Sequence, residues 1–208
     1  MLMKTNFCVI CNKEFEDFSL SNLLSKNKRK LCNKCKDELS PKYIKFMHKT
    51  IKIRAIYDYN SKIKELIYLF KGCYDYELNS IFLEPCLWYL KLLFFDYYIV
   101  WVPSTKIDDE KRGYNHVEEI YKNMGLKMLN LIYKNVDFKQ SDLSYQNRLK
   151  SIKNFSIEND VDLTNKKILL VDDIYTSGTT IEACYNLIKK LKPKNIKVLV
   201  LAKTSLKK

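Results

Sequence analysis

Two adjacent acids, Asp172 and Asp173, follow an apolar run and precede a stretch of hydroxyl residues. Five residues, 174–178, separate them from the next expected helix, so they stand too far away to cap it. The hydroxyl stretch consists of Thr176, Ser177, Gly178, Thr179 and Thr180. Hydroxyls and free N–H groups at a helix start cradle a phosphate, and glycine permits a close backbone approach or a positive φ. Carboxylates repel phosphate, so the two acids should face hydroxyls or a cation.

A ligand that carries vicinal hydroxyls close to a phosphate is a ribose 5-phosphate. The sequence contains no GxxxxGK[ST] motif for a nucleoside triphosphate. The stretch ILLVDDIYTSGTT, residues 168–180, resembles the phosphoribosyl pyrophosphate (PRPP) signature of type I phosphoribosyltransferases. This resemblance implies that Asp172 and Asp173 hold the ribose hydroxyls and that residues 176–180 hold the 5-phosphate. It also implies Mg2+ bound with PRPP and metal-assisted departure of pyrophosphate from an oxocarbenium-like carbon.

The segment after an expected strand, residues 97–102, matches the position of the pyrophosphate loop in these enzymes. Its candidate PRPP ligands are Ser104, Lys106 and Arg112. Three acids at 108–110 occupy positions where arginine is more usual in relatives, which weakens the assignment of individual anion ligands.

Arg148 matches an arginine of the resembling family, in the segment 140–155. Two interpretations stay open for it: a catalytic residue that closes over pyrophosphate, or a solvated cation. Thr176 stands where hypoxanthine-guanine enzymes place an aspartate base near the purine. The sequence therefore indicates no acceptor base, and catalytic turnover stays open.

Four cysteines form two CxxC pairs, with twenty residues between the pairs: Cys8, Cys11, Cys32 and Cys35. This spacing is typical of a tetrahedral Zn2+ site. Four thiolates leave no open position for water, so we expect a structural role for the zinc rather than a catalytic one. We expect residues 1–40 to form this zinc finger. The other cysteines sit among apolar neighbours and are predicted to be small core residues: Cys73, Cys86 and Cys184.

Residues 41–208 are predicted to form one α/β domain, because expected strands alternate with expected helices. The expected strands are 53–57, 97–102, 167–174 and 196–201, and a helical linker pattern precedes the first. The expected helices are 63–70, 78–94, 115–131 and 179–191. The fold class is a type I phosphoribosyltransferase fold, a mostly parallel sheet with helices on both faces, preceded by the small zinc finger. Ligands of such sheets lie beyond the carboxyl ends of the strands.

The chain carries a net charge of +13, of which residues 1–54 hold +8 from 13 Lys+Arg against 5 Asp+Glu. Such a surplus favours polyanions, although lysine is frequent throughout the sequence. The finger aromatics, Phe7, Phe15 and Phe18, either stack bases of single-stranded DNA or form the finger's own small core. Charges and a proline interrupt the apolar region 81–102, so no membrane span is expected. No signal peptide is visible, so a cytoplasmic location is expected.

Six motifs occur in a fixed order along the chain: the CxxC pairs, YDYNSKIKELIYLFKG, VP with RGYNH, residues 140–155, LLVDDIYTSGTT and LAKT. This ordered set resembles the ComF/ComFC family of bacterial DNA uptake. Tyr114, His116 and Ser151 depart from the family pattern.

The resemblance implies a competence protein for natural transformation that binds PRPP and helps handle incoming single-stranded DNA in the cytoplasm. It places the protein at the inner face of the membrane with the uptake machinery. An uptake helicase or a recombination mediator is its expected protein partner. Two alternatives stay open: an active Mg-dependent phosphoribosyltransferase of unknown acceptor in nucleotide metabolism, and a scaffold for which PRPP is a folding or regulatory ligand.

Overall fold

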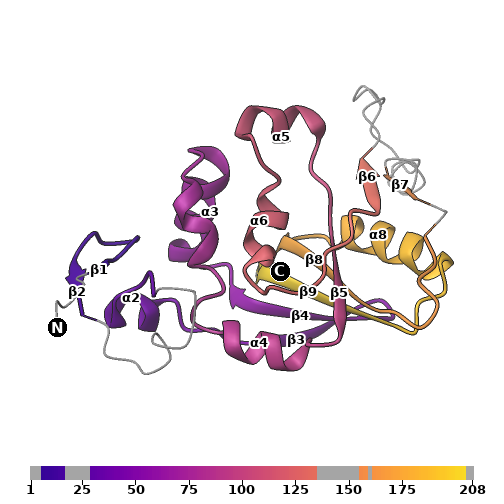
Figure 1. The fold of residues 1–208 in the computed structure, drawn as a ribbon, viewed down its shortest axis with the longest axis horizontal. Helices are drawn as coiled ribbons and strands as arrows, with labels where there is room; N and C mark the ends of the chain where they lie inside the picture. The colour runs from indigo at the N-terminus through magenta and orange to yellow at the C-terminus, as the bar shows by residue number, and fades with distance from the viewer. Residues whose placement is uncertain (1–5, 17–28, 135–154, 159–160, 205–208) are drawn as a thin grey trace.

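The computed structural model describes residues 6–16, 29–134, 155–158 and 161–204 of the 208-residue chain (Figure 1). Its centre is a five-stranded sheet in the order β3-β4-β9-β8-β5. These strands span β3 Ile44–His48, β4 Ile51–Asp58, β9 Asn195–Lys203, β8 Lys167–Tyr175 and β5 Tyr97–Trp101. The pairs β4–β9, β9–β8 and β8–β5 are parallel, and β3 pairs antiparallel with β4. The predicted mostly parallel sheet is confirmed.

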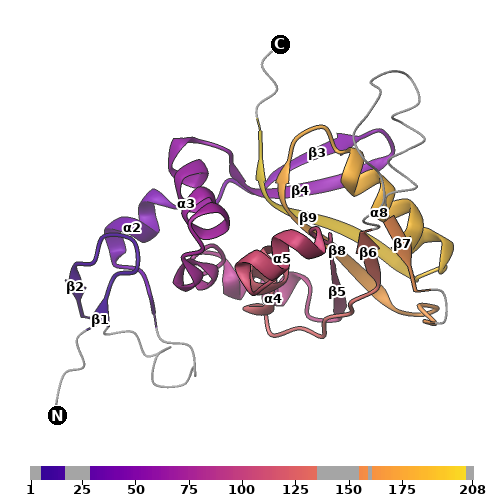
Figure 2. The same ribbon diagram turned by 90° about the horizontal axis from the view of Figure 1, so that it is seen from above.

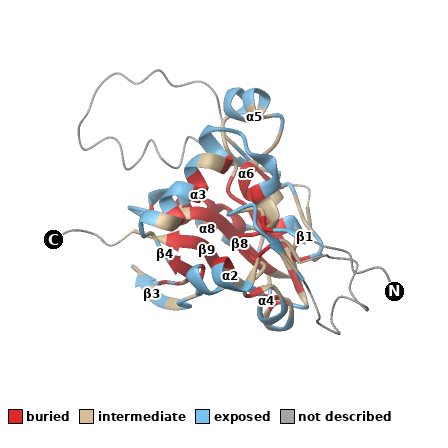
Figure 3. Cartoon of the chain, turned by 90° about the vertical axis from the view of Figure 1, so that its left-hand side faces the viewer, coloured by how far each residue is buried: buried red, intermediate tan, exposed pale blue. Residues whose placement is uncertain are grey.

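Helices cover both faces of this sheet, because successive strand residues point to opposite faces and both sets are apolar (Figures 1 and 2). Leu169 and Val171 of β8 pack with α3 (Ser61–Gly72), α4 (Leu87–Leu93) and α6 (His116–Lys122). We call this set the first core. Ile168 and Leu170 pack with α8 (Thr179–Lys190) in a second core. Buried residues are therefore concentrated in the strands, whereas the outer helix faces are exposed (Figure 3).

Smaller elements surround the sheet. They are β1 Asn6–Phe7, β2 Glu14–Phe15, α2 Asn33–Glu38, the 3-10 helix η1 Tyr76–Ser80, α5 Lys106–Arg112, β6 Ile132–Lys134 and β7 Phe155–Ile157. None of the helices in the described ranges is long and apolar enough to cross a lipid bilayer.

The expected strands match β4, β5, β8 and β9, and the expected helices match α3 and α8. The prediction of a helical linker before the first expected strand is wrong, because residues 44–48 form β3. The helix expected at 78–94 is also wrong: Pro85 lacks an N–H group, and α4 begins only after it, at Leu87. The helix expected at 115–131 ends at Lys122. Beyond Gly125 the chain turns to lie beside β5, where the N–H group of Ile99 donates to the Lys127 carbonyl.

The three other cysteines divide between core and surface. Cys86 and Cys184 are buried, as predicted. Cys73 is exposed, so the prediction of a core position is wrong there. Its position explains the difference, because it follows the last residue of α3 and is the C-cap of that helix.

The cysteine-bearing segment docks on the sheet domain through Glu84. The Glu84 carboxylate accepts the backbone N–H groups of Lys30 at 3.0 Å and Leu31 at 3.3 Å. Leu31 and Leu39 are fully buried in the first core. Burial raises the pKa of Glu84, and the two N–H bonds oppose that rise. This contact therefore joins the segment to the domain at a half-buried, hydrogen-bonded position.

We predict that Glu84→Ala lowers the free energy of unfolding by about 1–3 kcal/mol, because it leaves two backbone donors without their partner. Thermal or urea unfolding measures this change. The matched control is Glu77→Gln, which removes the ion pair between Glu77 and Lys30. That pair is exposed, so its loss should change stability by less than about 1 kcal/mol. Equal effects of the two variants would contradict the docking role of Glu84.

Candidate functional site

Asp172 and Asp173 lie near the carboxyl end of β8 and are both buried. The Asp173 carboxylate faces the helices of the first core. Its Oδ2 atom lies 2.9 Å from Nε2 of His116 on α6 and 2.9 Å from Nζ of Lys71 on α3. A strand end and two helices thus meet at one carboxylate oxygen.

The contacts of the second ring nitrogen, Nδ1, determine the protonation state of His116. Nδ1 lies 2.7 Å from Nη1 of Arg112, which can only donate, so Nδ1 carries no proton and accepts. The ring is then neutral, with Nε2–H donating to Asp173. Burial lowers the pKa of His116, despite the opposing effect of Asp173, which agrees with the neutral ring. Ser104 Oγ lies 3.2 Å from the same Nδ1 and completes the contacts.

The two acids occupy opposite electrostatic environments. Burial alone would raise the pKa of Asp173, but His116 and Lys71 outweigh it and hold this pKa well below the usual range. Burial, and then the charge of Asp173, raise the pKa of Asp172 well above the usual range. Asp172 accepts the Asp173 N–H at 2.9 Å and forms no ion pair with any described residue. Asp172 is therefore the carboxylate that a hydroxyl or a cation would stabilise most.

Residues 176–178 connect β8 to α8, with Gly178 as the N-cap and Thr179 and Thr180 in the first turn of the helix. Gly178 has φ +76°, and a Cβ atom there would lie 2.7 Å from Nδ1 of His48 and 2.8 Å from Cε2 of Tyr175. The backbone conformation and the lack of room for a Cβ atom therefore both require glycine. The His48 and Tyr175 side chains fill the space where that atom would lie. The hydroxyl residues on either side are exposed, and Ser177 Oγ lies 3.0 Å from Thr179 Oγ1. The loop presents hydroxyls and helix-start N–H groups to solvent.

Side chains that were not predicted from the sequence pack against residues 176–178. Nδ1 of His48, on β3, lies 2.9 Å from the Tyr175 hydroxyl, and its Nε2 lies 3.4 Å from Oε2 of Glu182 on α8. The N–H and hydroxyl groups of Thr204 donate to the Tyr175 carbonyl at 3.0 and 3.1 Å. The LAKT motif was a usable signal for Thr204, whereas nothing in the sequence points to His48.

The predicted pyrophosphate segment forms a short helix, α5, in place of an open loop. The Arg112 side chain is 4% exposed, so it is not free to move in solvent. It donates to His116 and to the Asp108 carbonyl, and it lies 3.5 Å from Asp109. Lys106 is exposed at the start of α5.

The structure brings two of the predicted anion ligands, Ser104 and Arg112, to Asp173 through His116. It does not place Lys106 in that group. Arg148 lies outside the described residues. Lys71 and His116 were not predicted as site residues, although the RGYNH motif marks the second of them.

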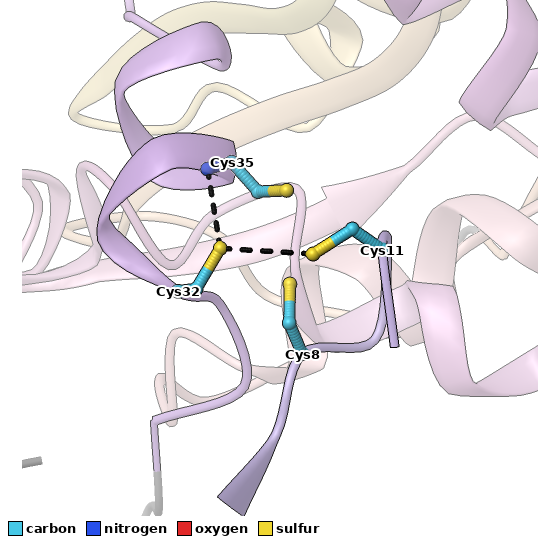
Figure 4. A group of neighbouring side chains, drawn as sticks. All are labelled: Cys8, Cys11, Cys32 and Cys35. Atoms are coloured by element: carbon cyan, nitrogen blue, oxygen red, sulfur yellow. Dashed lines mark hydrogen bonds between the residues drawn. The ribbon is translucent and has the colours of Figure 1, made fainter. Parts of the chain in front are cut away.

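The four predicted zinc ligands form one cluster (Figure 4). The Sγ atoms of Cys8, Cys11, Cys32 and Cys35 all lie within 4.8 Å of one another. Four Zn–S bonds of about 2.3 Å give a tetrahedron with edges of about 3.8 Å. Cys11 Sγ and Cys32 Sγ are 3.8 Å apart, and the Cys35 N–H donates to Cys32 Sγ at 3.5 Å. Burial would raise the pKa of Cys8, but backbone N–H groups outweigh it and lower that pKa to about 7. The cluster fits a metal ion such as zinc.

Two comparisons with known proteins match large parts of the chain. The family model described as "Phosphoribosyl transferase domain" matches residues 111–207. Competence protein ComFC of Streptococcus pneumoniae is 30% identical over 198 residues, which cover 94% of this chain and 87% of that protein.

Solved structures match at lower identity. Adenine phosphoribosyltransferase of Saccharomyces cerevisiae is 14% identical with a TM-score of 0.39, covering 83% of this chain and 89% of that one. A hypoxanthine-guanine phosphoribosyltransferase of Bacillus anthracis is 17% identical with a TM-score of 0.39, covering 62% and 70%.

The match to ComFC covers 94% of this chain and 87% of that protein. The chain therefore belongs to the ComF/ComFC family and has a type I phosphoribosyltransferase fold preceded by a four-cysteine cluster.

Proposed function

We propose that this chain is a competence protein that binds PRPP with Mg2+ and helps handle incoming single-stranded DNA during natural transformation. The observation that supports PRPP as the ligand is the order of groups at the end of β8. Buried Asp172 and Asp173 come first, and the exposed hydroxyl loop at the start of α8 follows. The name of the pneumococcal relative supports the role in competence. We place the protein in the cytoplasm, at the inner face of the membrane, with an uptake helicase or a recombination mediator as partner.

Each group of the site has a role in this proposal. Residues 176–180 bind the 5-phosphate, and Asp172 meets the ribose hydroxyls or the metal. His116 and Lys71 keep Asp173 ionised and fixed in place. Ser104, Lys106 and Arg112 line the pyrophosphate side. Mg2+, held by carboxylate and phosphate oxygens, would neutralise the pyrophosphate charge.

The cysteine cluster has a separate role. We propose that it holds a structural Zn2+ ion, with residues 1–40 as the finger and 41–208 as the phosphoribosyltransferase domain. Leu31, Cys35 and Leu39 are buried in the first core, so the metal would fix a segment that the domain itself packs against.

A second candidate function is an active phosphoribosyltransferase. The match to the phosphoribosyl transferase domain favours it. Pyrophosphate release from PRPP and Mg2+ with a panel of bases separates the two functions. Release that Asp172→Asn and Asp173→Asn abolish would favour the enzyme, and PRPP binding without release would favour the binding protein.

We predict that Gly178→Ala weakens PRPP binding at least about tenfold, because the added Cβ displaces His48 or Tyr175 and with them the phosphate loop. Isothermal titration with PRPP and Mg2+ measures the affinity. Gly125→Ala is the matched control, since Gly125 also has a positive φ, but its Cβ would meet only the end of the Lys91 side chain, at 3.8 Å. Unchanged binding in folded Gly178→Ala protein would remove the loop from the site.

Asp172→Asn should also weaken PRPP binding about tenfold, because it replaces an accepting oxygen with an NH2 group that only donates, and a hydrogen bond is worth about 0.5–1.5 kcal/mol. The same titration measures it, with the exposed Asp162→Asn as control. Wild-type protein that fails to bind PRPP at all would refute the proposed ligand.

Metal analysis tests the cysteine cluster. We predict one zinc ion per chain in the purified protein and its loss in Cys11→Ser, which removes one ligand of four. Cys73→Ser should keep the full zinc content, because Cys73 is exposed and lies outside the cluster. Zinc retained at full stoichiometry in Cys11→Ser would contradict the assignment.

A further inference from the structure

The hairpin of β3 and β4 has one apolar and one basic face. Its apolar residues pack into the second core: Ile44, Phe46, Ile51 and Ile53. Because neighbouring strand residues point to opposite faces, the residues between them lie on the other face. These are Lys45, Met47, Lys52 and Arg54, of which the first three are exposed and Arg54 is half-buried. The hairpin therefore turns three cations away from its own core.

Two of these cations oppose each other directly. Lys45 pairs with Arg54 across the antiparallel ladder. Like charges in this position destabilise a sheet. Neither side chain forms an ion pair with any residue in the described ranges. A bound anion between them would remove this repulsion.

Helix α4 adds large apolar side chains beside the hairpin. Trp88, Leu92 and Phe95 are 78%, 61% and 74% exposed. Their spacing of four and three residues places them along one side of α4 and its end, turned away from the core residue Leu90. An exposed apolar stripe of this size marks an interaction surface.

The hairpin and α4 enclose a groove. Its walls are mostly apolar and hold two cations, Lys45 and Arg54. The other lining residues are Tyr43, Ala55, Ile56, Tyr89, Leu90, Leu93, Phe94 and Leu199. The Tyr43 and Tyr89 rings meet edge to face at 4.9 Å. Figure 3 shows β3 and α4 on the same side of the molecule, with much of their surface exposed.

A further cation lies at the carboxyl end of α4. Lys197 Nζ lies 5.6 Å from the Phe94 ring centroid and 4.7 Å from that of Tyr97. Lys167 pairs with Asp96. Lys197 therefore adds a positive charge beside Phe94, the residue that follows α4.

We infer that this surface binds single-stranded DNA, with phosphates against the cations and bases stacked on Trp88 and Phe95. We call it the α4 surface and define it as Lys45, Lys52, Arg54, Trp88, Leu92, Phe95 and Lys197. The inference rests on the proposed role in handling incoming DNA and names the surface that performs it. Lys167 and Asn195 begin the strands at this end of the sheet, whereas the PRPP site lies at their carboxyl ends.

Three cations of the described finger residues already have partners within the chain. Arg29 lies over the Phe15 ring at 5.5 Å, and Lys30 pairs with Glu77. Lys34 lies 4.0 Å from Glu38. An anionic membrane fits the α4 surface less well than DNA does, because Lys45 and Arg54 line a groove with tyrosine walls instead of rimming a flat apolar face.

Two experiments on the full chain test the inference. The first is the salt dependence of binding to fluorescein-labelled oligo-dT. Lys45→Gln/Arg54→Gln should reduce the slope of log Kobs against log salt by about 1.4, at about 0.7 for each phosphate contact. Lys189→Gln/Lys190→Gln, which removes two cations from α8, should leave affinity and slope unchanged. Trp88→Ala should weaken binding at least about fivefold.

The second experiment uses tryptophan fluorescence. The chain has two tryptophans, Trp88 and the buried Trp101. Unlabelled oligo-dT should quench the wild-type emission by stacking on Trp88. Trp88→Phe should keep DNA binding, because phenylalanine still stacks, and should lose the quenching. Persistent quenching in this variant would overturn the contact.

The outcomes separate the inference from the proposed function. Wild-type protein that binds no oligo-dT refutes the DNA role itself and the inference with it. Binding that Lys34→Gln/Lys36→Gln weakens, but the α4 variants do not, keeps the DNA role and overturns the α4 surface. Binding to phosphatidylglycerol vesicles that needs Trp88, without oligo-dT binding, assigns the surface to a membrane and also overturns it.

Discussion

The rest of the site depends on the burial of two neighbouring carboxylates at the end of the central strand. A buried charge needs compensation, and the chain supplies it for Asp173 alone, from His116 and Lys71. Asp172 is left with a backbone N–H and a raised pKa. The fold thus holds one acid fixed and ionised while the other responds to whatever is bound. This asymmetry is built by three separate elements, β8, α6 and α3, so the site exists only in the folded domain.

Much of this arrangement could be predicted from the sequence. The strand at 167–174 and the helix at 179–191 lie within two residues of β8 and α8, because a continuous apolar run and an amphipathic pattern are strong local signals. The cysteine cluster could be predicted equally well, since the CxxC spacing alone defines it. These are features whose cause lies within a short stretch of chain.

What could not be predicted depends on contacts between distant residues. His48 lies 127 positions from Tyr175, and no local pattern indicates that its ring fills the space beside Gly178. The sequence pattern indicates only that Lys71 is a cation at the end of a helix, whereas in the structure it forms an ion pair with Asp173. The linker before β4 has a helical pattern, but residues 44–48 form the strand β3 because they pair with β4. Tertiary pairing of this kind overrides local propensity.

The register of the β3–β4 hairpin positions side chains on both of its faces. Its pairing places Lys45 opposite Arg54 and also positions His48, the last residue of β3, against Gly178. A slip of one residue would turn every side chain of β3 to the other face. Lys45 would then enter the second core, and the histidine would leave the phosphate loop. The turn at Lys49, with φ +52°, therefore sets the shape of the loop after β8 as well as the charge on the opposite face of the hairpin.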